Sequence, residues 1–273
     1  MAHKVLVCDK MDPKAVEQIK QLGFDVTVRT DMSPDELGEV IPEYEAIIVR
    51  SATKVREPII DKASSLKVIV RAGVGLDNID VEYAKSKGIE VKNTPAASSS
   101  SVAELALAHI FSCYRFLYAS NVTMREGKWL KKQYKGHEVA GKVLGIVGLG
   151  RIGKQLAKRA IPLGMTVKAY DPFIVSAGVE GVELVGSLED LLSQADIVSL
   201  HVPAPEKGYI IGKTELAKMK DGALLINCAR GGVVDENALV DALENNKLFA
   251  AAVDVFEEEP TNNQRLLKNP KVS

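Results

Sequence analysis

Short runs rich in Val, Ile and Leu alternate with amphipathic stretches over the first third of the chain. The apolar runs predict strands and the amphipathic stretches predict helices, so their alternation indicates β-α-β units and a parallel sheet. The expected strands are residues 4–9, 25–29, 46–49, 68–71 and 90–92, and the expected helices are residues 13–22, 33–39 and 57–63.

A second series with the same rhythm follows. Its expected strands are residues 142–147, 166–170, 197–200, 223–227 and 250–254, and its expected helices are residues 152–163, 188–194, 213–218 and 236–243. Between the two series, Ser101 and Glu104 have capping-box spacing, and an apolar stripe continues at helical spacing to Met124. We therefore expect two α/β domains, residues 1–97 and 98–273, with residues 99–126 as a long interdomain helix.

Length and composition agree with two domains and narrow the range of partners. The chain has 273 residues, 46% of them hydrophobic, which is too long for one ordinary single-core domain. Lys and Arg number 35 against 36 Asp and Glu, so no basic excess indicates a nucleic-acid partner. No stretch reaches the ~20 apolar residues of a membrane span, and the start lacks a signal-peptide pattern. We expect a cytoplasmic protein that binds neither nucleic acid nor membranes.

The cysteines indicate neither disulfides nor a metal. Cys8, Cys113 and Cys228 lie far apart and form no Cys-x-x-Cys or Cys/His spacing. Isolated cysteines of this kind are usually buried, reduced thiols. No metal site is expected.

A glycine-rich turn carries the first chemical signal. Gly148, Gly150 and Gly153 form a Gly-x-Gly-x-x-Gly motif between a strand-like run and a helix-like stretch. In that setting the first glycine permits the tight turn, the second lets backbone approach a pyrophosphate, and the third lets helix and strand pack closely. Arg151 is positioned to add a charged contact to the phosphates. The motif alone is weak, but its strand-turn-helix context predicts a dinucleotide site.

Asp171 suggests which dinucleotide is bound. It ends the expected strand 166–170, at about the distance of 20 residues from the glycines where a carboxylate binds the ribose hydroxyls. A carboxylate there repels a 2′-phosphate, which favours NAD over NADP. The alternative is a strand-end turn residue before Pro172.

Five segments, in the same order, resemble the D-isomer-specific 2-hydroxyacid dehydrogenases. They are residues 71–80 (RAGVGLDNID), Asn93-Thr94-Pro95 with residues 101–104 (SVAE), the glycine motif with Asp171, residues 227–235 (NCARGGVVD) and residues 254–260 (DVFEEEP). The resemblance implies two Rossmann-like or flavodoxin-like parallel-sheet domains with a cleft between them. Residues 1–97 would bind the substrate and residues 98–273 would bind NAD.

The resemblance also assigns two catalytic residues. Arg230 matches the arginine whose planar fork holds the substrate carboxylate and carbonyl oxygens, the alternative being a surface arginine in a glycine-rich turn. Glu259 matches the glutamate that hydrogen-bonds the catalytic histidine and stabilises its protonated form. On this reading Glu257 and Glu258 are bystanders in a solvated run of charges.

Other positions match those that contact cofactor or substrate in the family. The cofactor positions are Val74, Gly148, Gly150, Arg151, Ile152, Gly153, Asp171, Val202, Cys228 and Asp254, and Asp254 would accept a hydrogen bond from the carboxamide. The substrate positions are Arg50, Ser51, Arg71, Gly73, Val74 and Gly75. Arg50 and Arg71 match positions that bind a phosphate where the substrate is phosphorylated.

The family's catalytic histidine falls in a Pro-His pair that follows the segment matching residues 269–273, where this sequence stops. The histidines present are His3, His109, His137 and His201. His201 is the tempting substitute because it ends a strand near the expected cofactor, but its place matches a cofactor loop, and we interpret it as loop structure. We therefore expect either a truncated form or an incomplete part of a longer enzyme, and a true truncation should bind NAD yet turn over poorly.

The resemblance implies NAD-dependent oxidation of 3-phospho-D-glycerate to 3-phosphooxypyruvate, the entry to serine synthesis. A glyoxylate, hydroxypyruvate or D-lactate reductase is the alternative within the family, and Arg50 with Arg71 favours the phosphorylated substrate. From another class, an NAD-responsive binding protein like the family's co-repressors is possible, although Arg230 with Glu259 argues for chemistry. The small-molecule substrate is the expected partner, with a homodimer or higher homo-oligomer formed partly through residues 101–124.

Overall fold

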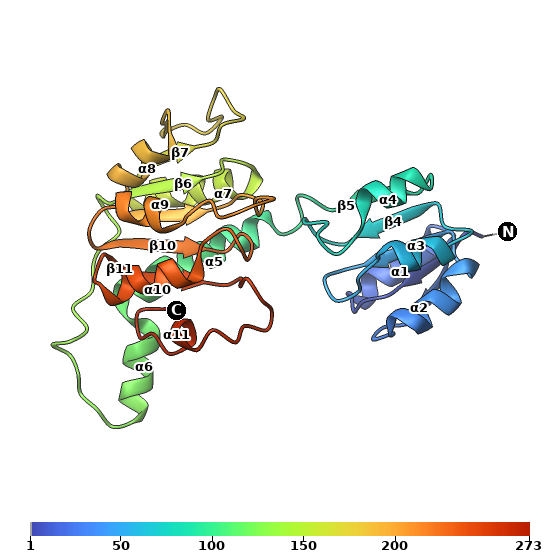
Figure 1. Cartoon of the computed structure of the whole chain (residues 1–273), viewed down its shortest axis with the longest axis horizontal. Coiled ribbons are helices and arrows are strands. Elements are labelled where there is room, and N and C mark those ends of the chain that lie inside the picture. The colour runs from blue at the N-terminus through green and yellow to red at the C-terminus, as the bar shows by residue number, and fades with distance from the viewer. Residues whose placement is uncertain (1) are drawn as a thin grey trace. The chain divides into compact units, whose positions relative to one another are not determined.

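The computed structural model describes residues 2–273, and the chain divides into two compact units, Met1–Ser98 and Ser99–Ser273. The sequence placed this boundary between residues 97 and 98. Each unit is built on its own parallel sheet (Figure 1).

The first unit has a five-stranded sheet in the order β2-β1-β3-β4-β5, and every neighbouring pair is parallel. Its strands are β1 (Lys4–Val7), β2 (Asp25–Val28), β3 (Ala46–Val49), β4 (Val68–Arg71) and β5 (Glu90–Asn93). Its helices are α1 (Pro13–Gln21), α2 (Pro34–Val40), α3 (Glu57–Lys62) and α4 (Val81–Ser86), with a 3-10 turn, η1 (Ile41–Glu43). The strand order reverses direction between β1 and β3, which makes the carboxyl ends of these two strands the expected ligand edge.

The second unit has a six-stranded parallel sheet in the order β11-β10-β9-β6-β7-β8. Its strands are β6 (Val143–Val147), β7 (Thr166–Tyr170), β8 (Val182–Leu184), β9 (Ile197–Leu200), β10 (Ala223–Asn227) and β11 (Leu248–Val253). Its helices are α5 (Ser99–Arg115), α6 (Leu117–Arg125), α7 (Arg151–Ala160), α8 (Leu188–Gln194), α9 (Lys213–Lys218), α10 (Glu236–Glu244) and α11 (Gln264–Leu267), with the 3-10 turn η2 (Ile161–Leu163). The order reverses between β6 and β9, as in dinucleotide-binding folds.

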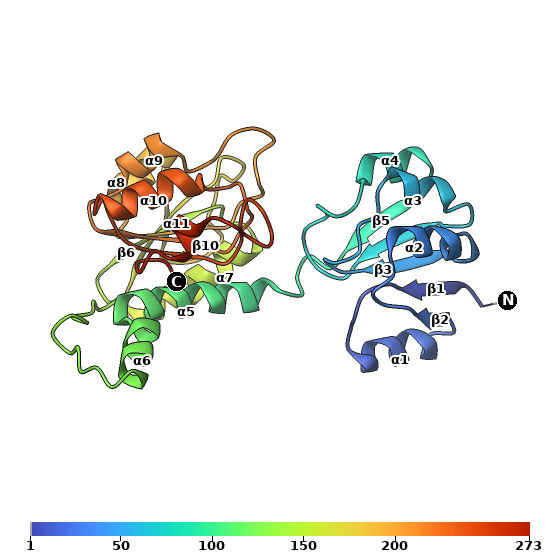
Figure 2. The ribbon, with the colours of Figure 1, turned by 60° about the horizontal axis from the view of Figure 1, so that its bottom comes forward.

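Helices cover both faces of this sheet (Figure 2). One face packs an apolar cluster against α8, α9 and α10, and the other packs a second cluster against α5 and α7. Because both faces are covered, the central strands β9 and β10 are fully buried and apolar except for Ser199 and Asn227. The predicted fold class, two parallel-sheet α/β domains, is confirmed.

The prediction of one long helix over residues 99–126 is wrong. Phe116 adopts a left-handed conformation with φ +53°, which separates α5 from α6. The Tyr114 carbonyl accepts a hydrogen bond from His137 N at 3.0 Å, and the Phe116 ring packs at 5.5 Å from Tyr134 and 5.7 Å from Phe249. These distant partners stabilise the break, so local sequence periodicity could not reveal it.

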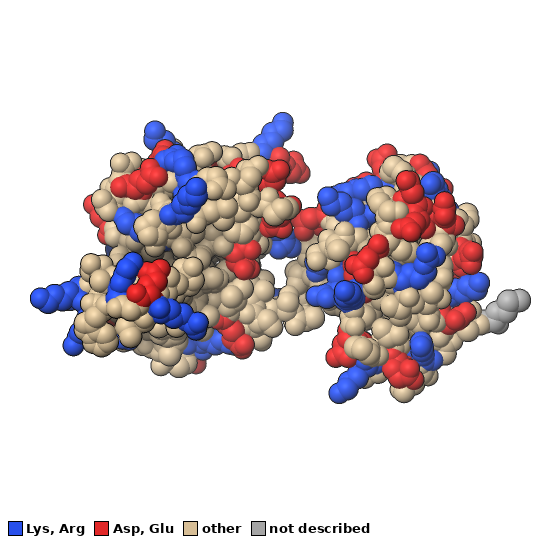
Figure 3. All heavy atoms as spheres, turned by 90° about the horizontal axis from the view of Figure 1, so that it is seen from below, with Lys and Arg blue, Asp and Glu red and all other residues tan. Residues whose placement is uncertain are grey.

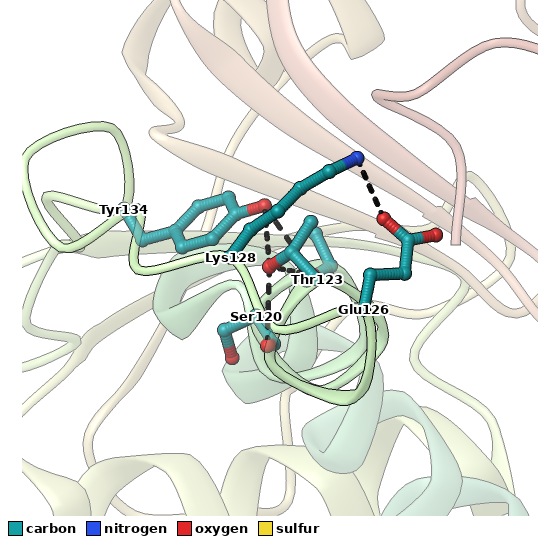
Figure 4. Close-up of polar contacts among 6 residues, drawn as sticks. Ser120, Thr123, Glu126, Lys128 and Tyr134 are labelled. Carbon is teal, nitrogen blue, oxygen red and sulfur yellow. Dashed lines mark hydrogen bonds and ion pairs between the residues drawn. The ribbon is translucent and has the colours of Figure 1, made fainter.

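The helix α6 and the polar segment after it extend away from the sheet of their unit in both views (Figures 1 and 2). Side chains tie this projection together: Thr123 Oγ1 and Tyr134 Oη lie 3.2 Å apart, and Lys128 Nζ donates to Glu126 Oε2 at 2.8 Å (Figure 4). We call residues 117–138 the arm. It exposes several large apolar side chains, namely Leu117, Tyr118, Met124 and Trp129.

Four further elements were not predicted: η1, α4, β8 and α11. In addition, Val272 forms a parallel bridge with Ala251, and Val253 N donates to Ser273 O at 3.0 Å.

None of the helices formed by residues 2–273 has the length and apolar character that crossing a membrane requires. Acidic and basic side chains are interspersed on the face shown in Figure 3.

Candidate active site: a dinucleotide turn and two substrate-facing loops

The glycine turn connects β6 to α7, and steric contacts explain two of its glycines. Gly148 has φ +89°, and a Cβ there would lie 2.5 Å from the His201 carbonyl oxygen. A Cβ on Gly153 would lie 2.3 Å from the Gly148 carbonyl oxygen. Gly150 differs, because no heavy atom lies within 4 Å of where its Cβ would be. The turn is therefore packed on its inner side and open at Gly150.

The helix α7 begins at this open point. Gly150 is its N-cap and supplies no side chain, so the first-turn N–H groups are not capped by a side chain. Free N–H groups and the positive end of the helix dipole favour an anion. Arg151 is exposed and Ile152 is half-buried on this first turn. The arrangement fits a pyrophosphate.

Asp171 lies beside the same turn, at the end of β7. Its Oδ2 accepts a hydrogen bond from Leu149 N at 2.9 Å, and its Oδ1 accepts one from Phe173 N at 3.0 Å. Each carboxylate oxygen can accept a second bond, so the group keeps capacity for two hydroxyls. Asp171 can therefore both stabilise the local turn before Pro172 and accept hydrogen bonds from the ribose hydroxyls.

The end of β9 lies on the other side of the point where the strand order reverses, between β6 and β9. His201 N donates to Val147 O at 2.8 Å, and Val202 lies against Gly148, where a Cβ would approach its Cγ1 to 2.8 Å. The His201 ring pairs through Nε2 with Ser199 Oγ at 2.9 Å, and burial lowers the pKa of His201 to about 4. Within residues 2–273, the buried Nδ1 of His201 has no hydrogen-bond partner. A neutral imidazole held in this way fits the interpretation of loop structure.

The ends of β10 and β11 bring Cys228, Arg230 and Asp254 into one region. Asn227 is buried, its Nδ2 donates to Arg230 O at 3.2 Å, and its main-chain oxygen accepts from Asp254 N at 3.0 Å. Arg230 Nη1 donates to Ala229 O at 2.7 Å. Burial and the nearby Asp254 charge raise the pKa of Cys228 to about 12. Cys228 is therefore a thiol at neutral pH, and the exposed Asp254 carboxylate lies beside it.

The turn that carries Arg230 packs against the loop that carries Glu259. A Cβ on Gly231 would lie 1.8 Å from the Phe256 carbonyl oxygen, so no larger residue fits without a backbone shift. Phe256 N in turn donates to Glu259 Oε1 at 3.2 Å. The two residues predicted to be catalytic thus stand on loops in direct contact.

Glu257 is exposed, as expected for a solvated run of charges, but it also makes two hydrogen bonds to a distant residue. Its Oε1 accepts a hydrogen bond from Glu236 N at 3.1 Å, while Glu236 Oε1 accepts one from Glu257 N at 2.8 Å. Glu258 differs, since its Oε2 accepts only from the exposed Asn262 Nδ2, at 3.0 Å, among the contacts of the described chain. The run of acidic residues looked uniform because the partner of Glu257 lies 21 positions away.

In the first unit, a buried aspartate organises the loop after β3. Asp9 accepts hydrogen bonds from Arg50 N and, at 2.9 Å, from Thr53 Oγ1. Asn78 Nδ2 donates to Arg50 O at 2.8 Å and to Thr53 O at 2.7 Å. Arg50 and Ser51 stand exposed on this loop. The sequence did not single out Asp9, which follows β1, or Asn78, which lies in the loop between β4 and α4, although polar loop residues often carry function.

The neighbouring loop, after β4, carries Arg71 and residues 73–75. A Cβ on Gly73 would lie 1.1 Å from Arg71 Nη1, so the guanidinium lies directly over the Gly73 backbone. Thr94 N donates to Gly73 O at 2.9 Å, and Asn93 Nδ2 donates to Val74 O at 2.6 Å. The Asn93-Thr94 pair therefore fixes the main chain of the predicted carboxylate loop. No group of three or more His, Cys, Asp or Glu side chains suited to a metal ion occurs among residues 2–273.

Comparison with known sequences identifies the family. The sequence profile of the D-isomer specific 2-hydroxyacid dehydrogenase NAD-binding domain matches residues 107–273, which is more than half of the chain. The chain belongs to this family. The resemblance noted from the five segments is confirmed, and so is NAD as the cofactor.

Known members of the family differ in the names they carry. The chain is 47% identical over 267 residues to D-3-phosphoglycerate dehydrogenase of Methanocaldococcus jannaschii, covering 97% of this chain and 51% of that protein. It is 46% identical over 259 residues to hydroxypyruvate reductase of Thermotoga maritima, covering 94% of this chain and 84% of that protein. The chain thus spans about half the length of the phosphoglycerate dehydrogenase that it matches.

Solved structures of 2-hydroxyacid dehydrogenase type share the fold. A glyoxylate reductase from Paecilomyes thermophila superposes with a TM-score of 0.90 at 32% identity, covering 99% of this chain and 87% of that one. The family and the fold are therefore shown together, while the substrate differs among these relatives.

Proposed function

We propose that the protein oxidises 3-phospho-D-glycerate to 3-phosphooxypyruvate with NAD, the entry to serine synthesis. Bound NAD would supply the hydride acceptor for C2 of the substrate, and the C2 hydroxyl would lose its proton to the family's catalytic histidine. The relative from Methanocaldococcus jannaschii, named D-3-phosphoglycerate dehydrogenase, supports this substrate.

The observation that carries the proposal is the pair of arginines in the first unit. Arg71 ends β4, and Val49, the residue before Arg50, is its register partner on β3. The two guanidinium-bearing residues therefore leave adjacent parallel strands at the same edge of the sheet. Arg50 Nη1 donates to Lys10 O at 2.8 Å, which leaves most of its five N–H donors for an anion. Two guanidinium groups suit a phosphate dianion, which an unphosphorylated acid would not require.

The remaining residues take roles that their surroundings support. Gly73 N already donates to Arg71 O at 2.8 Å, so the N–H groups of Val74 and Gly75, on a loop held by Asn93 and Thr94, would bind the substrate carboxylate. Arg230 would hold the carboxylate and polarise the C2 oxygen. Glu259, on the adjoining loop, would stabilise the protonated form of the family's catalytic histidine, which follows the segment matching residues 269–273 and is none of His3, His109, His137 and His201. Asp171 and the open turn at Gly150 would hold the adenosine ribose and the pyrophosphate of NAD.

A second candidate is reduction of hydroxypyruvate or glyoxylate, favoured by the Thermotoga maritima relative, of which this chain covers 84%. A substrate panel at fixed NAD or NADH concentration separates the two: 3-phospho-D-glycerate, D-glycerate, glycolate and D-lactate for oxidation, with hydroxypyruvate and glyoxylate for reduction. We expect 3-phospho-D-glycerate to have the highest kcat/KM. Arg50→Gln should raise the KM for this substrate about tenfold or more, the loss of one charge-assisted contact, and leave that for D-glycerate nearly unchanged. Preference for an unphosphorylated acid would refute the assignment.

We also propose that the protein is a homodimer formed through the arm. Leu117, Tyr118, Met124 and Trp129 are 53–76% exposed there, and large apolar side chains gathered on a projection favour a protein partner. Light scattering should give twice the monomer mass, and Tyr118→Glu with Trp129→Glu should shift it toward the monomer. A monomeric wild-type protein would contradict this.

A further inference from the structure

The Arg230 turn and the Glu259 loop are joined at a second place besides Gly231. Glu236 is the first residue of α10, where Asp235 is the N-cap and accepts from Ala238 N at 3.0 Å. A first-turn N–H group has no partner within its own helix. The Glu236 N–H finds its partner in Glu257 Oε1, and the Glu257 N–H finds one in Glu236 Oε1. We call this the Glu236–Glu257 pair.

Glu236 is unusual for a carboxylate because it is buried, with 7% of its surface exposed. Its second oxygen, Oε2, accepts from Asn263 Nδ2 at 3.2 Å, and Asn263 is the N-cap of α11. Burying a charged group is costly unless hydrogen bonds compensate, and here both oxygens are bonded. One side chain thus connects the start of α10, the loop at Glu257 and the start of α11.

The rest of the turn is held by backbone bonds. Val234 forms a parallel bridge with Ile211, and Asp235 N donates to Ile211 O at 3.0 Å. The Tyr209 ring stands nearby, where Glu257 raises the pKa of its hydroxyl. Between Arg230 and Glu236 the chain is therefore anchored at its middle and at its end, which leaves little freedom to the arginine.

We propose that Glu236 and Glu257 are positioning residues that set the placement of Arg230 relative to Glu259. The proposal rests on the function proposed above for these two groups. Arg230 is six positions before Glu236, and Glu259 is two positions after Glu257, so the pair and the Gly231–Phe256 contact tie the two loops at both ends. Misplacement of a reacting group by about 1 Å can cost about a hundredfold in rate.

The test compares three variants in the NAD-bound protein. Glu257→Ala removes the acceptor, Glu257→Gln keeps a carbonyl oxygen in its place, and Glu258→Ala removes an exposed carboxylate next to it as the matched control. We expect Glu257→Ala to lower kcat for 3-phospho-D-glycerate about tenfold to a hundredfold, with the NADH dissociation constant from fluorescence titration unchanged. Glu257→Gln should recover most of the loss, and Glu258→Ala should match the wild type. If Glu257→Ala does not fold, Glu257→Met keeps the length of the side chain without an oxygen.

Hydrogen exchange distinguishes failure of this inference from failure of the proposed function. In Glu257→Ala the amide of Glu236 and those of residues 229–235 should exchange faster, and in Glu257→Gln they should stay protected. If the wild type oxidises no 2-hydroxy acid, the proposed function is wrong, while the exchange result still decides whether the pair holds the turn. Equal exchange and equal kcat in Glu257→Ala and Glu258→Ala would overturn the inference. So would a loss of NADH affinity as large as the loss of kcat, because that would indicate a general structural defect.

Discussion

Two glycines of the dinucleotide turn should respond to the same substitution in different ways. In Gly153→Ala the new methyl group would lie 2.3 Å from the Gly148 carbonyl oxygen and 3.1 Å from Ile146 Cγ2. An ordinary carbon contact needs about 3.5 Å, so α7 would have to move away from β6 by roughly 1 Å. In Gly150→Ala the methyl group would meet no heavy atom within 4 Å.

The expected magnitudes follow from this difference. Overpacking of this kind costs about 1–3 kcal/mol, and each kcal/mol lowers the Tm of a domain the size of Ser99–Ser273 by about 2–4 °C. Gly153→Ala should therefore lower Tm by about 2–12 °C and also weaken NADH binding. Gly150→Ala changes only an N-cap and should cost less than about 1 kcal/mol. It should nevertheless weaken NADH binding about tenfold or more, because its methyl group would occupy the space assigned to the pyrophosphate.

The assay is a thermal melt without cofactor, paired with a fluorescence titration of NADH. The wild type and both variants are measured in the same buffer. Wild-type NADH affinity in Gly150→Ala would refute the placement of the pyrophosphate at this turn. A wild-type Tm in Gly153→Ala would refute the steric argument instead.

Three more predictions concern buried polar groups. Asp9→Asn should raise the KM for 3-phospho-D-glycerate several-fold without changing the NADH affinity, because it weakens the hydrogen bonds that hold the loop carrying Arg50. Asp25→Asn, at an exposed position, is the control. An equal effect of both variants on KM would contradict this role of Asp9. Burial lowers the pKa of His201 to about 4, so the free energy of unfolding should fall as the pH drops from about 6.5 toward 4, and urea melts of His201→Gln should lack that dependence. Burial raises the pKa of all three cysteine thiols, to about 12 for Cys8 and Cys228 and about 11 for Cys113. These thiols should resist iodoacetamide at pH 8 until urea unfolds the protein, and the stability that they contribute should be lost as the pH rises from the unfolded value near 8.5. Rapid alkylation of the native protein would count against this.

Much of the fold follows from local pattern. The strands 46–49, 68–71, 166–170, 197–200 and 223–227 were predicted with the bounds that the structure has. Four of them are mainly apolar runs, as in buried parallel strands, and 166–170 alternates between buried and more exposed positions. The capping-box spacing of Ser101 and Glu104 did not mark a helix start, because α5 begins at Ser99, whereas Ser33 and Glu36, with the same spacing, form a capping box at the start of α2. The elements α4, β8 and α11 were not predicted, although helices and strands of similar length, such as α3, α9 and β3, were.

For the site, the sequence by itself determined which chemical groups are present: the glycines of the turn, Asp171, Arg230 and Glu259 stand in motifs whose spacing is local and readable. Only the tertiary structure decided how these groups are held. Phe116 breaks a helix that its own sequence would continue, because Tyr134 and Phe249 offer a packing site. Glu257 differs from its neighbours Glu258 and Glu259 because it hydrogen-bonds Glu236, whose N–H at the start of α10 has no partner within its own helix. Periodicity and spacing report contacts within a few residues of the chain, whereas these partners are brought together by the order of the strands, which no local pattern records.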